Sequence, residues 1–288
     1  MSRRSILPLE LERHIFELAA LSRPVSIPTL LRVAWRIKHW LERMLYMTLV
    51  VGVKDPLDGV PSCSVEIFKR IARTKPVFLH DFVRNLMVER IPPEDMRFIL
   101  SMCRAVENLH ILPNASLGPA EHPVISTMPL RHLYCHLRTL DQLIPFESFR
   151  HLLFRNITHL ELFGGFHEED REDEGLVHWT GLAALPHLTH LALNSYLFHT
   201  CTKILTAYKS LFALLILHPP PTHYSMELAS LIDDPRFVMM SLPDFTDDWQ
   251  RGILVGEDYW ARADAFITKR MSGEIDRRDF FLEDGTRS

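Results

Sequence analysis

The chain has 288 residues, a formal net charge of −4, 47% hydrophobic residues and 24% charged residues. This length corresponds to about two domains at ~150 residues each, or to one elongated repeat array. The composition excludes a chain that is disordered throughout, and the charge excludes the strongly basic footprint of a nucleic-acid-binding protein. No apolar run is long enough for a membrane span. From the charge we expect no nucleic-acid partner, and from the absence of such a run we expect no membrane partner.

The first 50 residues are expected to form a small helical module. A first helix starts at Pro8 and carries an apolar face of Leu11, Ile15, Leu18 and Ala19. After a break over residues 22–28, apolar residues at helical spacing between positions 30 and 45 predict a second helix. Residues 51–76, which are rich in turn residues between positions 54 and 64, are interpreted as a linker.

An internal repeat dominates the middle of the chain. The hexapeptide Ile157–Leu162 recurs as Leu188–Leu193, and both copies read L-x-x-L-x-L with aliphatic substitutions. The same pattern starts at 83, 106, 130, 157, 188 and 211, close to the ~20–29-residue period of leucine-rich repeats. A seventh strand is predicted around Phe237 and Met239, in register with a start at Asp234. Residues 77–243 are therefore expected to form a short, irregular leucine-rich-repeat-like solenoid of the α/β class, with parallel strands.

Alternation along a strand assigns the repeat positions to two faces. The fourth and sixth positions are expected in the solenoid core, and the first is expected to anchor the turn before them. The residues between them are expected to face outward on a concave sheet, at the third and fifth positions. That face is the predicted partner-binding surface, with Asn108, His110, His132, Tyr134, His159, Glu161 and His190 as its candidate residues. Because His and Glu are zinc ligands and histidine titrates near neutral pH, a metal site and a pH-sensitive contact are the alternatives. We predict no metal and no cofactor, since side chains on a flat column diverge.

Motifs for catalysis are absent from the sequence. The acidic run from His167 to Glu174 is interpreted as a solvated loop, with a basic partner or a cation as alternatives. Its start resembles H-E-x-x-H, but Arg171 stands where the second histidine is needed. Nucleophile-elbow, phosphate-loop and dinucleotide motifs are also missing, so we expect a binding protein and not an enzyme.

The C-terminal region is expected to cap the solenoid. Asp258 precedes Tyr259, Trp260 and Ile267 at helical spacing, which predicts a helix within a cap over residues 244–272 that covers the last repeat. Residues 273–288 are mostly charged and are expected to be a flexible tail. The four cysteines, at 63, 103, 135 and 201, have no C-x-x-C spacing. They fit reduced thiols, so a cytoplasmic or nuclear location is expected.

Two segments of the chain resemble a known family. Leu7-Pro8-Leu9-Glu10 with Ile15-Phe16, followed by a second helix that ends Trp40–Tyr46, looks like a divergent F-box. The stretches 234–238, 248–249 and 259–263 are similar to the ending of a group of fungal F-box-like, leucine-rich-repeat-like proteins.

The resemblance implies a receptor subunit of a cullin ubiquitin ligase. F-box modules dock a Skp-type adaptor, and their repeats select a protein target, which here is unknown. Carried onto this sequence, the implied adaptor-binding residues are Leu7, Pro8, Leu11, Ile15 and Phe16. The alternative is a leucine-rich-repeat scaffold without a ubiquitin-ligase role, in which the N-terminal helices only cap the open end of the solenoid.

Overall fold

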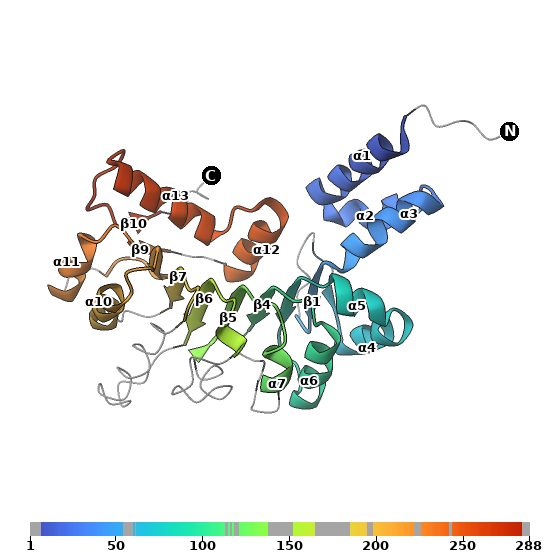
Figure 1. Cartoon of the computed structure of the whole chain (residues 1–288), viewed down its shortest axis with the longest axis horizontal. Coiled ribbons are helices and arrows are strands. Elements are labelled where there is room, and N and C mark those ends of the chain that lie inside the picture. Colours follow the sequence, from blue (N-terminus) through green and yellow to red (C-terminus); the bar gives the residue numbers. More distant parts are fainter. Residues whose placement is uncertain are drawn as a thin grey trace.

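The computed structural model describes residues 7–53, 60, 62–112, 115, 117, 121–137, 152–164, 185–194, 198–221, 226–241 and 244–283. Within them, ten strands form one sheet in which every neighbouring pair is parallel (Figure 1). The strands are β1 Thr48–Val51, β2 Ser62–Cys63, β3 Asn85–Val88, β4 Asn108–Ile111, β5 His132–His136, β6 His159–Phe163, β7 His190–Leu193, β8 Ala213–Ile216, β9 Phe237–Met240 and β10 Phe281–Leu282. From β3 to β10 the strands lie side by side in chain order, whereas β1 separates β3 from β2 at the other edge.

The predicted repeat register is present in the sheet. The third residue of each predicted repeat pairs with the third residue of the next, so that Asn85, Asn108, His132, His159, His190 and Ala213 form one row. All six predicted strands are confirmed, and Phe237 pairs with Leu214 as the predicted seventh strand requires. The chain is therefore an α/β protein with a parallel sheet.

Two separate clusters of buried side chains lie on the two faces of this sheet. The fourth and sixth positions of the pattern bury their side chains in the larger cluster, as predicted, and the first position is buried there too; for the hexapeptide that starts at 157 these residues are Ile157, Leu160 and Leu162. Helices on this face are α4 Val65–Thr74, α5 Pro76–Phe82, α6 Pro93–Met102, α7 His122–Ile125, α10 Phe198–Ala207 and α11 Met226–Ile232. The 3₁₀ helix η4 Leu152–Phe154 also packs there.

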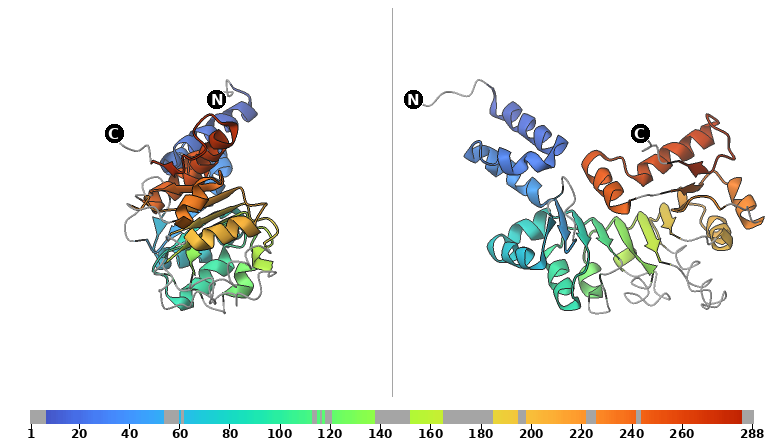
Figure 2. Two further views of the ribbon diagram at one scale, coloured as in Figure 1. Left: turned by 90° about the vertical axis from the view of Figure 1, so that its left-hand side faces the viewer. Right: turned by 180° about the vertical axis from the view of Figure 1, so that it is seen from behind.

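The opposite face of the sheet carries the second cluster and the C-terminal helices. Its strand residues include Met87, Tyr134 and Leu215, and its helical residues come from α12 Phe245–Val255 and α13 Tyr259–Ser272. The N-terminal helices stand on this same side of the sheet, toward the other end (Figures 1 and 2). They are α1 Leu9–Ser22, η1 Pro24–Ser26, α2 Ile27–Leu30, α3 Trp35–Leu41 and η2 Glu42–Tyr46.

The predicted linker over residues 51–76 is wrong in its described part. Strand β1 already begins at Thr48, and β2 and α4 lie within the expected linker. Tyr46, Leu49 and Val51 have the spacing of the first, fourth and sixth positions of the L-x-x-L-x-L pattern, and all three belong to the larger core cluster. The sequence pattern did not identify this strand because tyrosine stands in the first position, where the pattern requires an aliphatic residue.

The expectation of a flexible tail from residue 273 is also wrong in its described part. Strand β10 pairs with β9, and Phe280 is buried with its ring 6.4 Å from that of Phe237. The guanidinium of Arg270, on α13, is buried and donates hydrogen bonds to the backbone carbonyls of Ile232, Phe237 and Arg277. These bonds join α13, β9 and the tail, since a buried guanidinium requires acceptors for its N–H groups.

The second predicted helix is divided. Ala34 has extended backbone angles, so α3 begins only at Trp35, and its continuation from Glu42 is a 3₁₀ helix. Among the described residues, no helix combines the length and the apolar composition that a membrane crossing requires.

Candidate functional site

Helix α1 is apolar on two opposite faces. One face packs Phe16 and Ala20 into a small core with Ile27, Ile37 and Leu41. Phe16 is thus largely committed to the module's own core. Its side chain is partly buried there, because helical geometry points positions 16 and 20 to the same side, and its contact with an adaptor stays a prediction.

The other face of α1 carries most of the remaining apolar residues that the sequence singled out. Leu11, Ile15 and Leu18 are 53%, 52% and 51% exposed. We call these three residues the α1 stripe. Their spacing of four and three residues places them on one line along the helix. The prediction of an apolar face was right in spacing, but that face points to solvent and not into the module.

Two further predicted residues lie at the start of the helix. Leu7 is exposed, and Pro8 occupies the N-cap position, so that α1 begins one residue later than expected. Ion pairs fix the orientation of α1 from its flanks: Arg36 contacts Glu12 at 2.6 Å and Arg43 contacts Glu17 at 3.0 Å. The exposed direction of the stripe is therefore set by contacts within the module.

Large exposed apolar side chains concentrate in this module. Of the 16 found among the described residues, nine belong to residues 7–35; they are Leu7, Leu9, Leu11, Ile15, Leu18, Leu21, Val25, Val33 and Trp35. Single exposed apolar residues are ordinary on soluble proteins, whereas a group of them marks an interaction surface.

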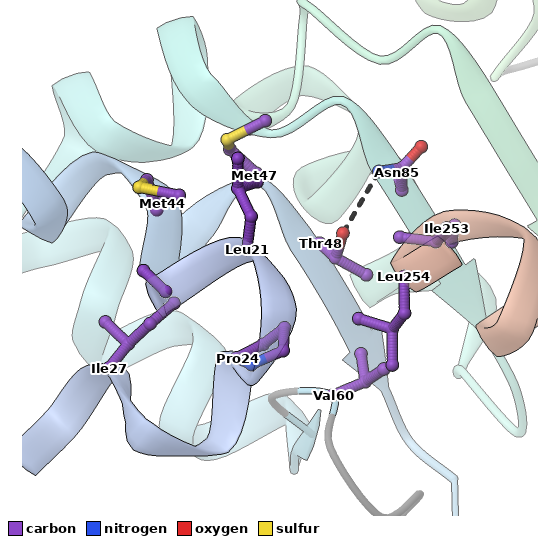
Figure 3. A pocket seen from close by; sticks show the side chains of 11 residues that line it. Leu21, Pro24, Ile27, Met44, Met47, Thr48, Val60, Asn85, Ile253 and Leu254 are labelled. Carbon is purple, nitrogen blue, oxygen red and sulfur yellow. Dashed lines mark hydrogen bonds between the residues drawn. The ribbon is translucent and has the colours of Figure 1, made fainter. Parts of the chain in front are cut away.

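A small cavity of about 100 Å³ lies where the module meets the sheet and α12 (Figure 3). Its walls are mainly apolar and include Leu21 and Met44 from the module and Leu254 from α12. In the wall formed by the sheet, the side-chain amide of Asn85 donates a hydrogen bond of 3.0 Å to Thr48 Oγ1. Ligand cavities typically exceed about 300 Å³, so this one is a packing gap between elements.

The predicted concave face is not an open surface. Helices α12 and α13 lie over it, and His110, Tyr134, Glu161 and His190 are buried. Asn108, His132 and His159 remain partly exposed. The expectation of a solvent-facing row is therefore corrected: the chain's own C-terminal helices occupy the middle of this face, where sequence patterns suggested only a cap on the last repeat.

Polar contacts between the sheet and these helices are specific. Trp249 Nε1 donates to Asn108 Oδ1 at 3.3 Å and Trp260 Nε1 donates to Tyr134 Oη at 3.2 Å. The Tyr259 hydroxyl donates to Glu161 Oε2 at 2.7 Å. Buried indole and phenol groups usually find partners, and here the outward repeat positions supply them.

The three predicted histidines form a stacked column. Ring centroids of His132 and His159 are 4.1 Å apart, those of His159 and His190 are 4.0 Å apart, and the ring of Trp260 meets the last two edge-on. Burial, with smaller contributions from neighbouring charges, lowers the pKa of His132 to about 4 and that of His159 to about 2. His190 Nε2 lies 2.9 Å from Asp264 Oδ1 on α13. The rings of His132 and His159 are therefore neutral at pH 7, and the column serves as a packing surface under Trp260.

Metal binding by this column has no geometric support. Within the part of the chain that the structure describes, no three His, Cys, Asp or Glu side chains are arranged to hold a metal ion. The acidic run His167–Glu174 lies outside the described residues. All four cysteines are free thiols, as predicted.

A larger cavity, of about 360 Å³, opens at the carboxyl ends of β4, β6 and β7. It is lined by His110, Leu112, Glu161, Phe163, Asn194, Asp244, Phe245 and Thr246. Only His110 and Glu161 among these were predicted as candidate residues. A sequence signal for Asn194 exists, since it is the polar residue directly after a strand, but it is weak without the fold.

The sequence matches no protein-family model and no curated protein. A function must therefore be inferred from the surfaces and cavities described above.

Proposed function

We propose that the chain is a non-enzymatic protein–protein interaction subunit of the leucine-rich-repeat-like solenoid type, and that the α1 stripe docks a Skp-type adaptor of a cullin ubiquitin ligase. The repeat register supports the solenoid class, since each unit buries its apolar face only against its neighbours. The resemblance of residues 7–16 to the F-box opening supports the choice of partner.

One observation carries the docking role: α1 has an apolar face left over after its own module is packed. A surface helix of a soluble domain normally shows one apolar stripe toward the core and a polar face toward water. Here Phe16 and Ala20 form the inward stripe, while Leu11, Ile15 and Leu18 form a second one. Residues at i, i+4 and i+7 are the usual anchors when helices pack against a partner.

Target selection by the concave face does not keep its predicted form. Tyr134 and Glu161 are hydrogen-bonded to α13, so a target could reach them only if that helix were displaced. We therefore restrict the proposed function to the adaptor contact, for which an exposed surface exists.

The docking role can be tested by co-expressing the full chain with a Skp-type adaptor and measuring co-elution. In the variant Leu11→Asp/Ile15→Asp, charges replace two exposed aliphatic side chains, so the fold should persist while co-elution is lost. The matched control is Val255→Asp/Met271→Asp, which places two charges at exposed apolar positions on α12 and α13. Circular dichroism checks the folding of both variants.

Each result has one meaning. Co-elution that is lost only in the α1 variant, with normal circular dichroism, supports the adaptor contact. Absence of co-elution for the folded wild-type chain rejects it, and so does equal co-elution of the wild-type chain and the α1 variant.

A second candidate function is a scaffold in which the N-terminal helices only cap the solenoid. It is favoured by the direct passage of η2 into β1 and by Tyr46, which is buried in the main core cluster. Lys75, between α4 and α5, also pairs with Glu42 of η2. If capping were the sole role, Leu11→Asp/Ile15→Asp would change neither folding nor any partner contact.

A further inference from the structure

The cavity at the carboxyl ends of β4, β6 and β7 has the position and size of a ligand site. Parallel sheets commonly bind ligands just outside the carboxyl ends of their strands. Its volume of about 360 Å³ falls within the usual range of about 300–1,000 Å³ for small-molecule sites. This cavity is separate from the α1 stripe and forms no part of the proposed adaptor contact.

Two buried polar atoms of the lining residues have no hydrogen-bond partner. Glu161 is 1% exposed and His110 is 2% exposed. Glu161 Oε2 accepts from Tyr259, but Glu161 Oε1 has no donor, and His110 Nδ1 has no partner either. A buried polar atom left unpaired costs about 1–3 kcal/mol, so two of them at one cavity require an explanation.

The groups around the cavity are mostly acceptors. Glu161 and Asp244 supply carboxylate oxygens, and the Asn194 side chain supplies an amide. Phe163 and Phe245 add aromatic surface, whose ring faces attract cations. A ligand that donates several hydrogen bonds and carries a positive charge would complement this set.

The charge state of the two buried groups agrees with this chemistry. Burial raises the pKa of Glu161 to about 7, although its hydrogen bond from Tyr259 acts in the opposite direction. Burial lowers the pKa of His110 to about 3, so its ring is neutral at pH 7 and presents no competing positive charge. A cation beside Glu161 would favour its carboxylate form, because an opposite charge stabilises the ionised state.

We propose that this cavity binds a small planar organic cation of the amidine or guanidine class, with its N–H groups donated to the unpaired acceptor of Glu161 and to the polar groups at the cavity mouth. A planar fork of N–H donors matches a carboxylate, and its flat faces suit the aromatic side chains. Asp244 and Asn194 provide additional acceptors for the remaining donors.

Isothermal titration of the full chain with benzamidine and with methylguanidine tests this assignment. We expect binding of at least one of them, and at least tenfold weaker binding of benzamide, a neutral analogue of benzamidine that lacks the cation. The variant Glu161→Gln should weaken binding of the cation at least tenfold. The control Glu257→Gln removes an exposed carboxylate near the start of α13 and should leave the dissociation constant unchanged.

A second variant protects the test against misfolding of Glu161→Gln. Asp244→Asn removes a charge from the cavity but retains an N-cap side chain for α12, where Asp244 accepts hydrogen bonds from the Thr246 and Asp247 amides. It should weaken binding at least threefold. Leu11→Asp/Ile15→Asp should bind the cation like the wild type, which separates this site from the adaptor contact.

The assignment is overturned if neither cation binds at a concentration of about 10 mM, because the dissociation constant would then lie above the millimolar range. It is also overturned if benzamide binds as tightly as benzamidine, or if folded Glu161→Gln and Asp244→Asn variants both bind as the wild type does.

Discussion

The two helical ends of the molecule use apolar side chains in opposite ways. At the C-terminal end, α13 buries Tyr259, Trp260 and Ile267 against the sheet. At the N-terminal end, α1 leaves Leu11 and Ile15 about half exposed. Both groups of helices stand on the same side of the sheet (Figure 2).

The difference lies in what each helix meets. The α13 aromatics find hydrogen-bond partners on the strands, as Trp260 does with Tyr134, so the contact satisfies polar groups as well as burying rings. The α1 stripe contains only aliphatic side chains, and the module already packs its opposite face. Apolar spacing therefore identifies a contact face, but only the fold shows whether the chain supplies the partner.

The largest expected effect breaks the C-terminal contact. Trp260 is 2% exposed and touches His159, His190 and Tyr134. Trp260→Ala should lower the free energy of unfolding by about 3–5 kcal/mol, as expected for a large buried aromatic. Urea denaturation measures it, with Met271→Ala on the exposed face of α13 as the control. A loss below about 1 kcal/mol would show that α13 does not depend on this ring.

A pH titration of stability sharpens the same contact. Burial lowers the pKa values of His110, His132 and His159 to about 3, 4 and 2, so the unfolded chain binds protons there below pH 6.5 that the folded chain does not. Their contribution is complete above pH 6.5 and is lost as the pH falls. The pKa of Glu161 is raised from 4.5 to about 7, so the folded chain holds a proton there that the unfolded chain releases. Its contribution to the free energy of unfolding is therefore lost as the pH rises from 4.5 to 7.

For these four groups together, the net uptake on unfolding near pH 5 is about two protons, three from the histidines less about one for Glu161. Their combined contribution to the free energy of unfolding should therefore fall by about 3 kcal/mol for each pH unit of acidification there. Urea denaturation at several pH values measures the slope of the free energy of unfolding against pH. The variant His159→Asn should take up about one proton fewer on unfolding, which lowers this slope by about 1.4 kcal/mol per pH unit. A slope unaffected by this substitution would contradict a buried, neutral His159.

The smallest expected effect concerns the N-terminal end. Leu18 is 51% exposed, so Leu18→Asp should change the free energy of unfolding by no more than about 0.5 kcal/mol. Ala20, two residues along the same helix, is fully buried, and Ala20→Asp should cost several times more, because it buries a charge in the module core. Thermal unfolding of both variants makes the comparison, and equal losses would mean that the stripe is packed within the chain.

Much of the sheet follows from local pattern. The L-x-x-L-x-L repeats place the strands because short-range alternation decides which side chains enter the core. The strand after Tyr46 was not predicted because an aromatic residue stands at the first position of its pattern. Strand β10 escaped because two residues, Phe281 and Leu282, carry no periodic signal.

The surfaces were less accessible to sequence reasoning because they depend on distant contacts. The hydrogen bond from Trp249 to Asn108 joins residues 141 positions apart, and the sequence around either residue does not indicate that the other is its partner. For α1, two stripes of apolar residues at helical spacing compete, and Phe16 and Ala20 win the core because the rest of the module packs there. The cavity unites ends of three strands with the start of α12, so only the assembled sheet reveals it.

The two outermost strands of the sheet are also its shortest. Strands β2 and β10 have two residues each, whereas the inner strands have four or five. An exposed strand edge is a template on which other chains can add and aggregate, and short edge strands limit this growth. A chain that ended before Phe280 would lack β10 and would leave the backbone N–H and C=O groups of β9 unpaired at the edge. Other copies of the chain could then add to this edge and polymerise.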